Sequence, residues 1–389
     1  MDVEQDRDRE RDREQDRGQD REQDREQDRE EADVSDQEAG REHDGPVAAV
    51  FTRRRVLAFV LALVVLAGVG VAYTLHAVER EDDKKYGGSG TAPGATPITL
   101  AGPPRLLFRS TESGPGYGHL ATVSAADPGG PRLVGDRTCE RVYAAAGTAL
   151  CLVVDRGVIS RNYALVLDDQ LRETRRVELS GTPNRARLSA SGRMASWTVF
   201  VYGDSYAGSS FSTRTSVLDT HTGAVVESLE DFAVTRDGKD VRTPDRNFWG
   251  VTFTADDNVF YATMSTFSPN RTYLVRGDFR ARTMTVVREN VECPSLSPDG
   301  TRLVFKKKVS DDARKPWRLY VLDLATGAET ALAEARSVDD QAVWLDDRTV
   351  AYDLPAGTGS ASDVWSVPAD GGGAPVRLVA GAFSPVPLG

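Results

Sequence analysis

The chain has 389 residues and a formal net charge of −11, and that imbalance lies in one segment. Residues 1–46 hold 20 of the acidic and 9 of the basic side chains, so the remaining 343 residues carry 39 of each. Because phosphate neutralisation needs a clustered positive surface that no segment supplies, nucleic acid is excluded as a partner. Three cysteines are too few for a disulfide-scaffold miniprotein or for a four-thiolate metal site within one chain.

Residues 1–55 are expected to form a disordered acidic tail. A Gln-Asp-Arg-Glu unit recurs at 19–22 and 23–26, and no apolar residue follows Val3 within the first 30 residues. Such a segment cannot bury enough apolar surface to offset the entropy of the ordered chain. A solvated segment without function and a weak docking or spacing role remain the two interpretations.

Residues 56–75 are expected to form a transmembrane helix. They run for twenty residues without a charge, and a helix of that length spans about 30 Å, the thickness of the hydrocarbon core. Arg53, Arg54 and Arg55 precede the span, so the positive-inside rule predicts a cytoplasmic tail and an extracytoplasmic remainder. The alternative is a cleaved or twin-arginine signal, but the apolar stretch and its leader are long for either, which favours an uncleaved signal anchor in the plasma membrane.

Residues 76–104 are expected to be a flexible linker, because Gly, Pro, Ser and Thr dominate from Tyr86 onward. A linker of this composition has a typical reach of about 30 Å.

Residues 105–389 are predicted to be all-β, since short runs rich in Val, Leu, Tyr, Phe and Thr alternate with Gly, Pro, Asp and Asn. One turn unit recurs, most clearly as Ser297-Pro298-Asp299-Gly300 between apolar strands and more loosely at Ser189–Gly192. A second unit follows it, Leu-Asp-x-x-Thr-Gly at 218–223 and 322–327. Asp-Gly and its substitutes tolerate the positive φ of tight hairpin turns.

Two hairpins per repeat make a four-stranded meander, and meanders at this period are the blades of a β-propeller. Residues 105–135 supply only three strands, and 382–385 repeat the start of the first unit, so the C-terminus is expected to close the N-terminal blade of a six-bladed propeller. Insertions near 203–210 and 233–247 are expected to enlarge the third blade with loops on one face. The four-stranded groups are expected at 139–180, 185–232, 248–290, 293–334 and 341–380.

The Ser297-Pro298-Asp299-Gly300 unit, followed by Val304-Phe305 and Tyr320–Asp323, resembles the TolB-like (WD40-like, PD40) propeller repeat. The resemblance implies six blades and an extracytoplasmic, envelope-associated binding role, and it carries over no catalytic residue. The chain is also similar to the membrane-anchored TolB-like translocation proteins of high-GC bacteria, a group whose activity the resemblance does not define. One departure is that TolB has an N-terminal α/β domain where this chain has an anchor and a linker.

No catalytic constellation is expected. Gly203-Asp204-Ser205-Tyr206-Ala207 mimics a serine-hydrolase elbow but lacks the helix that the elbow needs, and only His119 and His221 lie in the exported region. Paired carboxylates such as Asp339-Asp340 lack the spacing of a calcium loop, so no metal or other cofactor is expected. The alternative left open is a calcium ion in the funnel, held by carboxylates that converge from separate blades.

Cys139 and Cys151 flank a predicted hairpin symmetrically, so their side chains can approach closely enough for a disulfide that would persist outside the membrane. Cys293 is left as a buried free thiol.

The remaining candidates are polar and aromatic residues on the innermost strand of each blade, where a binding funnel would be lined. They differ from blade to blade, as a binding site requires, although they could also satisfy one another. The candidates are Arg141, Arg187, Trp249, Glu292 and Gln341. Four tryptophans at other strand positions, Trp197, Trp317, Trp344 and Trp365, are expected to pack between blades.

Together these features predict a membrane-anchored extracytoplasmic propeller that binds or scaffolds an envelope or secreted protein. The first alternative is a propeller enzyme, a lactonase or sugar-acting hydrolase, which would need carboxylates near the axis. The second is a transmembrane sensor, which the lack of any foldable domain in the tail disfavours.

Overall fold

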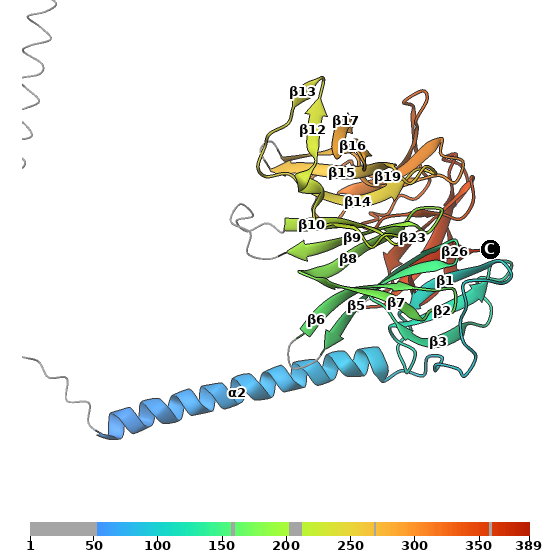
Figure 1. Ribbon diagram of the computed structural model, residues 1–389. Helices are drawn as coiled ribbons and strands as arrows, with labels where there is room; N and C mark the ends of the chain where they lie inside the picture. The colour runs from blue at the N-terminus through green and yellow to red at the C-terminus, as the bar shows by residue number, and fades with distance from the viewer. Residues whose placement is uncertain (1–52, 157–159, 202–211, 268–269, 358–359) are drawn as a thin grey trace, which may run out of the picture. The chain divides into compact units, whose positions relative to one another are not determined.

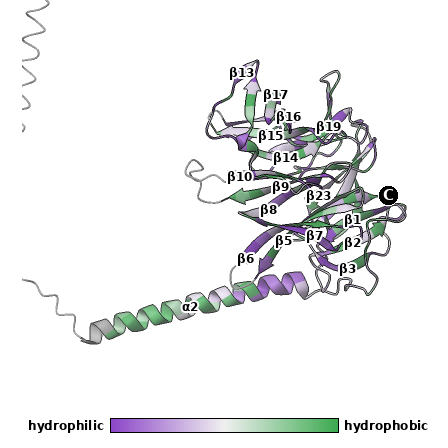
Figure 2. Ribbon diagram, in the orientation of Figure 1, coloured by the Kyte–Doolittle hydropathy of each residue, from purple (hydrophilic) through white to green (hydrophobic). Residues whose placement is uncertain are grey.

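The computed structural model describes residues 53–156, 160–201, 212–267, 270–357 and 360–389. The tail expected to be disordered and the insertion near 203–210 lie outside these ranges. Helix α2 (Arg53–Tyr86) continues past the predicted span at residue 75. Figure 2 shows this helix hydrophobic over most of its length and hydrophilic toward its C-terminal end. Within the described residues it is the one helix long and apolar enough to cross a membrane, as either a single-pass anchor or a signal sequence could.

Six sheets follow the helix, and the innermost strand of each contacts those of its neighbours: β26–β4, β4–β8, β8–β14, β14–β18, β18–β22 and β22–β26. This closed ring of sheets is a six-bladed β-propeller, as predicted (Figure 1). Blade 1 contains β26 (Ala382–Leu388), β1 (Arg105–Ser110), β2 (His119–Ser124) and β3 (Leu133–Thr138). Blade 2 contains β4 (Arg141–Ala145), β5 (Thr148–Arg156), β6 (Ser160–Leu167) and β7 (Glu173–Leu179). Blade 3 contains β8 (Thr182–Leu188), β9 (Met194–Val201), β10 (Ser212–Asp219) and β11 (Val225–Val226).

The second half of the ring repeats the same antiparallel meander. Blade 4 contains β14 (Asn247–Phe253), β15 (Val259–Phe267), β16 (Asn270–Asp278) and β17 (Thr283–Glu289). Blade 5 contains β18 (Glu292–Leu296), β19 (Arg302–Lys308), β20 (Trp317–Asp323) and β21 (Glu329–Ala331). Blade 6 contains β22 (Val343–Trp344), β23 (Thr349–Pro355), β24 (Ser362–Pro368) and β25 (Val376–Val379).

The C-terminal strand closes the ring as the sequence predicted. Strand β26 pairs antiparallel with β1, from Arg105 opposite Leu388 to Ser110 opposite Ala382. The pairing joins the two ends of the propeller and covers the backbone edge of β1 that an open array would expose.

The insertion at 233–247 enlarges a different blade from the one expected. After the 3-10 turn η1 (Leu229–Asp231), β12 (Ala233–Arg236) pairs in parallel with β17, and β13 (Lys239–Asp240) pairs with β12. Figure 1 shows this hairpin beside β17, so it extends the outer edge of blade 4, not blade 3. Apolar burial accounts for the change, because Phe232 and Val234 pack into the core cluster of blade 4.

The linker also differs from the expectation. Leu100 and Ile98 are buried in the core cluster of blades 1 and 2, and Leu100 N donates to Asp169 O at 2.7 Å. Closer to the helix, Ser113 Oγ donates to Lys84 O at 2.6 Å. The segment from residue 84 to residue 100 therefore packs on the propeller and is not a free tether.

The turn units form hairpins for the reason the sequence suggested. Gly300 and Gly192 have φ of +72° and +75°, which residues with a Cβ adopt only at a cost. In the first turn Asp299 accepts hydrogen bonds from Ser297 Oγ and Thr301 N, and these bonds hold the pKa of Asp299 below its usual range.

Candidate functional site: the axial funnel

Three cavities lie one after another along the propeller axis. The innermost strands all begin at one end of this axis and finish at the other, so the first residues of these strands line one cavity and their last residues line another. At the first end a cavity of about 400 Å³, here called the funnel, is lined by Arg141, Arg185, Phe200, Trp249, Glu292, Lys306, Trp317, Asp339, Asp340, Asp353 and Phe383, among others. At the opposite end a cavity of about 750 Å³ lies among the hairpin turns, including Ser297–Gly300 and the C-terminal residue Gly389.

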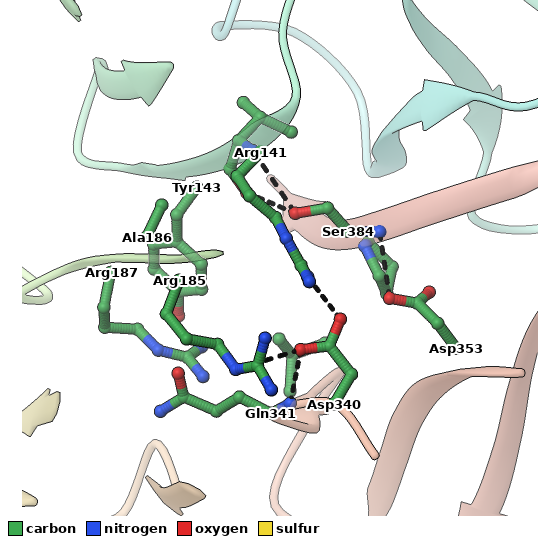
Figure 3. A pocket seen from close by; sticks show the side chains of 12 residues that line it. Arg141, Tyr143, Arg185, Ala186, Arg187, Asp340, Gln341, Asp353 and Ser384 are labelled. Carbon is green, nitrogen blue, oxygen red and sulfur yellow. Dashed lines mark hydrogen bonds and ion pairs between the residues drawn. The ribbon is translucent and has the colours of Figure 1, made fainter. Parts of the chain in front are cut away.

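Between these two lies the axial cavity, which has a volume of about 20 Å³ and is shown in Figure 3. Its charged and amide-bearing lining residues are Arg141, Arg185, Arg187, Asp340, Gln341 and Asp353. A space of this size holds about one water molecule, so the side chains around it form the floor of the funnel.

The five predicted residues separate by depth. Trp249 and Glu292 line the funnel, and Arg141 lines both the funnel and the axial cavity. Arg187 and Gln341 lie deeper and line the axial cavity instead. Gln341 Nε2 donates to Pro294 O at 2.7 Å and to Val251 O at 3.2 Å, so its amide ties blades 4, 5 and 6 together.

The floor is organised by Asp340, which is almost completely buried. Arg141 of blade 2 donates to it, Arg185 Nε of blade 3 lies 3.2 Å from its Oδ1, and Gln341 N donates to the same oxygen at 2.6 Å (Figure 3). Burial alone would raise the pKa of Asp340, but the charges of the two arginines outweigh burial and hold it well below its usual range.

A second buried carboxyl, Asp353 on β23, behaves in the opposite way. Burial raises its pKa well above the usual range, and the neighbouring negative charge of Asp340 adds to that shift. Ser384 N donates to Asp353 Oδ2 at 3.0 Å, while Oδ1 is buried with no hydrogen-bond partner. The floor therefore combines two buried carboxyl groups whose pKa values are displaced in opposite directions.

The funnel wall on blade 5 is a cation packed on an aromatic ring. Lys306 Nζ lies 4.0 Å from the centre of the Trp317 ring, 2.7 Å from Asp339 Oδ1 and 3.8 Å from Glu292 Oε2. Trp317 Nε1 donates to Glu292 Oε1 at 3.1 Å, which fixes the ring. Phe200 of blade 3, Trp249 of blade 4 and Phe383 of blade 1 are partly exposed and line the other sides of the funnel. An apolar surface with a few fixed polar groups is typical of a binding cavity.

Trp317 was expected to pack between blades and instead lines the funnel. Trp344 does pack in the core, where its Nε1 donates to Ser295 O at 2.8 Å, and Trp197 is buried as well. The residues that sequence reasoning missed, Arg185, Lys306 and Asp353, share one signal. Each is a charged residue that lies within a strand of the ring at a buried or half-buried position.

In the described part of the chain, no group of three or more His, Cys, Asp or Glu side chains could hold a metal ion. His119 Nδ1 contacts Gly135 O at 2.8 Å, and His221 lies in a hairpin turn, so neither lines the funnel. The serine at 205 lies outside the described residues. Four acidic side chains do line the funnel, Glu292, Asp339, Asp340 and Asp353, which meets the requirement stated for a funnel enzyme.

Cys139 and Cys151, the predicted pair, form a disulfide with a Cα–Cα distance of 5.5 Å. Cys151 lies on β5 and Cys139 just before β4, and both are buried in the core shared by blades 1 and 2. Cys293 is free and buried.

No family model matches the sequence, and no curated protein matches it. The structure is similar to TolB from Acinetobacter baumannii, with 13% identity over 75% of this chain and 67% of that chain and a TM-score of 0.49. It is also similar to a putative TolB from Agrobacterium tumefaciens, with 10% identity over 72% and 91% of the two chains and a TM-score of 0.44. An oligogalacturonate lyase in complex with manganese has 14% identity over 71% of each chain and a TM-score of 0.36.

The chain has the six-bladed propeller fold that its repeats predicted, and that architecture follows from the sheet order described above. At these identities the likeness concerns the fold alone.

Proposed function

We propose that this protein is a membrane-anchored propeller that binds a segment of another envelope or secreted protein in its funnel. The observation that carries the proposal is the wall of partly exposed aromatic rings, Trp249, Trp317, Phe200 and Phe383, around a cavity of about 400 Å³. Aromatic side chains supply large contact areas at low entropic cost, and they are enriched at the centres of protein-binding surfaces.

Two observations support an extracytoplasmic position for the propeller. Arg53, Arg54 and Arg55 precede the apolar helix, which favours a cytoplasmic N-terminus. The Cys139–Cys151 disulfide fits the other side of the membrane, because such bonds persist in oxidising compartments. The partner would then be a protein of the cell envelope or one secreted past it.

The test is affinity capture from solubilised membranes with the full-length protein as bait, compared with a bait ending at residue 104. A full-length Trp249→Ala/Trp317→Ala double variant removes the two largest rings of the funnel wall. Tyr163→Ala is the matched control, because it truncates a half-buried aromatic residue of β6 outside the funnel.

The proposal predicts a partner that is retained by the full-length bait and by Tyr163→Ala, and lost from the double variant and from the shorter bait. A partner retained equally by all the full-length baits would place the binding surface outside the funnel.

A second candidate function, acid–base catalysis, is favoured by the two floor carboxyls. Asp340 and Asp353 have pKa values displaced in opposite directions, an arrangement that enzymes use to separate an acid from a base. Asp340 is already held by two arginines, so Asp353 would be the general acid. Turnover of lactones or oligosaccharides by the wild type, lost in Asp353→Asn and kept in Asp370→Asn on a surface turn, would establish catalysis.

A further inference from the structure

The axial cavity carries more positive charge than its carboxylates neutralise. Three guanidinium groups line it, from Arg141, Arg185 and Arg187, and Arg141 and Arg185 share a single ionised carboxylate, that of Asp340. The other carboxyl at this cavity, Asp353, forms no ion pair with any of the three within the described residues. The ion pairs of the cavity therefore serve two of its three guanidinium groups and leave Arg187 with none.

Arg187 is the least compensated of the three. Only 4% of its surface is exposed, it donates one hydrogen bond, from Nη2 to Ala342 O at 3.2 Å, and its Cζ lies 4.4 Å from the centre of the Tyr143 ring. No carboxylate of the described residues is within ion-pair distance of it. A buried charge without a counter-ion is strongly unfavourable.

One donor atom at this cavity lacks an acceptor. Arg187 Nε is buried without a hydrogen-bond partner, whereas Arg185 Nε lies 3.2 Å from Asp340 Oδ1. Both side chains project from β8 toward the cavity (Figure 3). A guanidinium offers only donors, so whatever occupies the space beside them must accept hydrogen bonds.

The volume limits the occupant to a single small particle. A cavity of about 20 Å³ has room for one water molecule or one monatomic ion, and not for a carboxylate or phosphate group with its substituent. A water molecule would accept from the arginines, but it adds no charge and needs acceptors for its own hydrogens. A monovalent anion accepts hydrogen bonds from the arginines and supplies the negative charge that Arg187 lacks.

We propose that the axial cavity binds one halide ion, chloride under ordinary conditions, between Arg185 and Arg187. The ion acts as the missing counter-ion of Arg187 and completes the floor of the funnel. This site is independent of the proposed protein partner, so either idea can fail without the other.

The first test is thermal unfolding of the full-length protein in detergent, followed by tryptophan fluorescence at constant ionic strength. If the dissociation constant is about 1 mM, replacing gluconate by 100 mM chloride should raise Tm by about 5 °C. Bromide should act like chloride, and acetate should act like gluconate. Equal Tm values in chloride and gluconate would overturn the proposal, and an equal effect of acetate would show a carboxylate site instead of a halide site.

Arg187→Met tests the residue directly. The variant should lose the chloride-dependent rise in Tm, and in gluconate it should be at least as stable as the wild type, because it no longer buries an unpaired charge. Arg132→Met is the matched control: Arg132 also lies over an aromatic ring, that of Phe108 at 5.6 Å, but Glu112 pairs with it at 3.5 Å. The control should keep the full rise, and a rise kept by Arg187→Met would place the ion elsewhere.

A measurement on the wild type alone covers the case in which Arg187→Met does not fold. Exchange with a protein site broadens the chloride NMR line, so the full-length protein should broaden it and bromide should reverse the broadening. A line width unchanged by the protein would count against the site.

Discussion

Replacing Asp340 by Asn should destabilise the propeller more than any other single charge removal at the axis. Among the residues that the structure describes, Asp340 is the one carboxylate that both Arg141 and Arg185 contact, and it is 8% exposed. The amide keeps the shape and one acceptor, for example for Gln341 N, but it leaves two buried guanidinium groups without a negative charge. Breaking a buried ion pair on one side typically costs 3–5 kcal/mol, roughly a fall of 6–15 °C in Tm for a domain of this size.

The loss should depend on pH because Asp353 is a neighbour. The charge of Asp340 contributes to the raised pKa of Asp353, so removing that charge lowers the pKa of Asp353 toward its ordinary value. Asp353 then ionises more readily as the pH rises and replaces part of the missing negative charge. We expect Asp340→Asn to lose about 3–5 kcal/mol near pH 5 and less near pH 8.

Urea unfolding of the full-length protein at the two pH values measures this, with Asp311→Asn as the control. Asp311 pairs with Lys308 at 2.9 Å, but its side chain is 99% exposed, so the control should unfold like the wild type. In the Asp353→Asn background, Asp340→Asn should cost the same at both pH values, so the double variant Asp340→Asn/Asp353→Asn should lose the pH dependence relative to Asp353→Asn, since no carboxyl remains on the floor to replace Asp340. The reasoning is refuted if Asp340→Asn unfolds within 1 kcal/mol of the wild type at pH 5, or if the double variant keeps the pH dependence.

Three further predictions concern single features. Because the pKa of Asp353 is raised in the folded state, wild-type stability falls as the pH rises from about 3.9 through that raised pKa. Asp353→Asn should therefore be more stable than the wild type in urea unfolding at pH 8. Equal stability of the two proteins would contradict this prediction. Opening the Cys139–Cys151 disulfide, with a sequence separation of 12, should lower stability by about 3 kcal/mol when reduced and alkylated protein is compared with oxidised protein. Deleting residues 382–389 removes β26 and exposes the edge of β1, so the truncated chain should aggregate in size-exclusion chromatography, and a monomer with wild-type Tm would contradict this.

The blades could be predicted because almost every strand in this fold pairs with its neighbour in sequence. A hairpin such as β18–β19 shows itself locally, as an apolar run, an Asp-Gly turn and a second apolar run. Strand β12 breaks that rule, because it pairs in parallel with β17 about fifty residues later, Ala233 opposite Thr283. No local pattern distinguishes such a strand from a loop, and the insertion was therefore assigned to the wrong blade.

The linker shows the same limit. Its overall composition predicts flexibility, but the composition of a segment does not show that two of its residues are buried. Ile98 and Leu100 are both buried in the core of blades 1 and 2. A short polar segment can be fixed by a single pair of buried side chains when their burial offsets the cost of ordering the chain around them.

The funnel was predicted in part, since the period of two along an innermost strand indicates which residues face the axis but not how deep they lie. Arg141 and Arg187 both satisfy that pattern, yet their surroundings differ. Arg141 meets Asp340 across 199 positions of sequence, whereas Arg187 meets the ring of Tyr143 and a backbone carbonyl. Lys306 and Asp353 were not predicted because they lie on β19 and β23, each the second strand of its blade. Both nevertheless show a charge within an apolar run of the sequence.

Charge compensation at the axis is therefore a property of the closed ring and not of any blade. A blade alone would hold such a charge in water at little cost, and closure removes the water from all the axial charges at once. Asp340 can form ion pairs with Arg141 and Arg185 only because closure of the ring brings blades 2, 3 and 6 together. Closure also buries Arg187, which has no carboxylate beside it among the described residues. An ion that binds only the closed ring would stabilise the closed ring. The chloride experiment and the Asp340 experiment therefore both measure the free energy of unfolding of the ring: chloride adds a negative charge at the axis, and Asp340→Asn removes one.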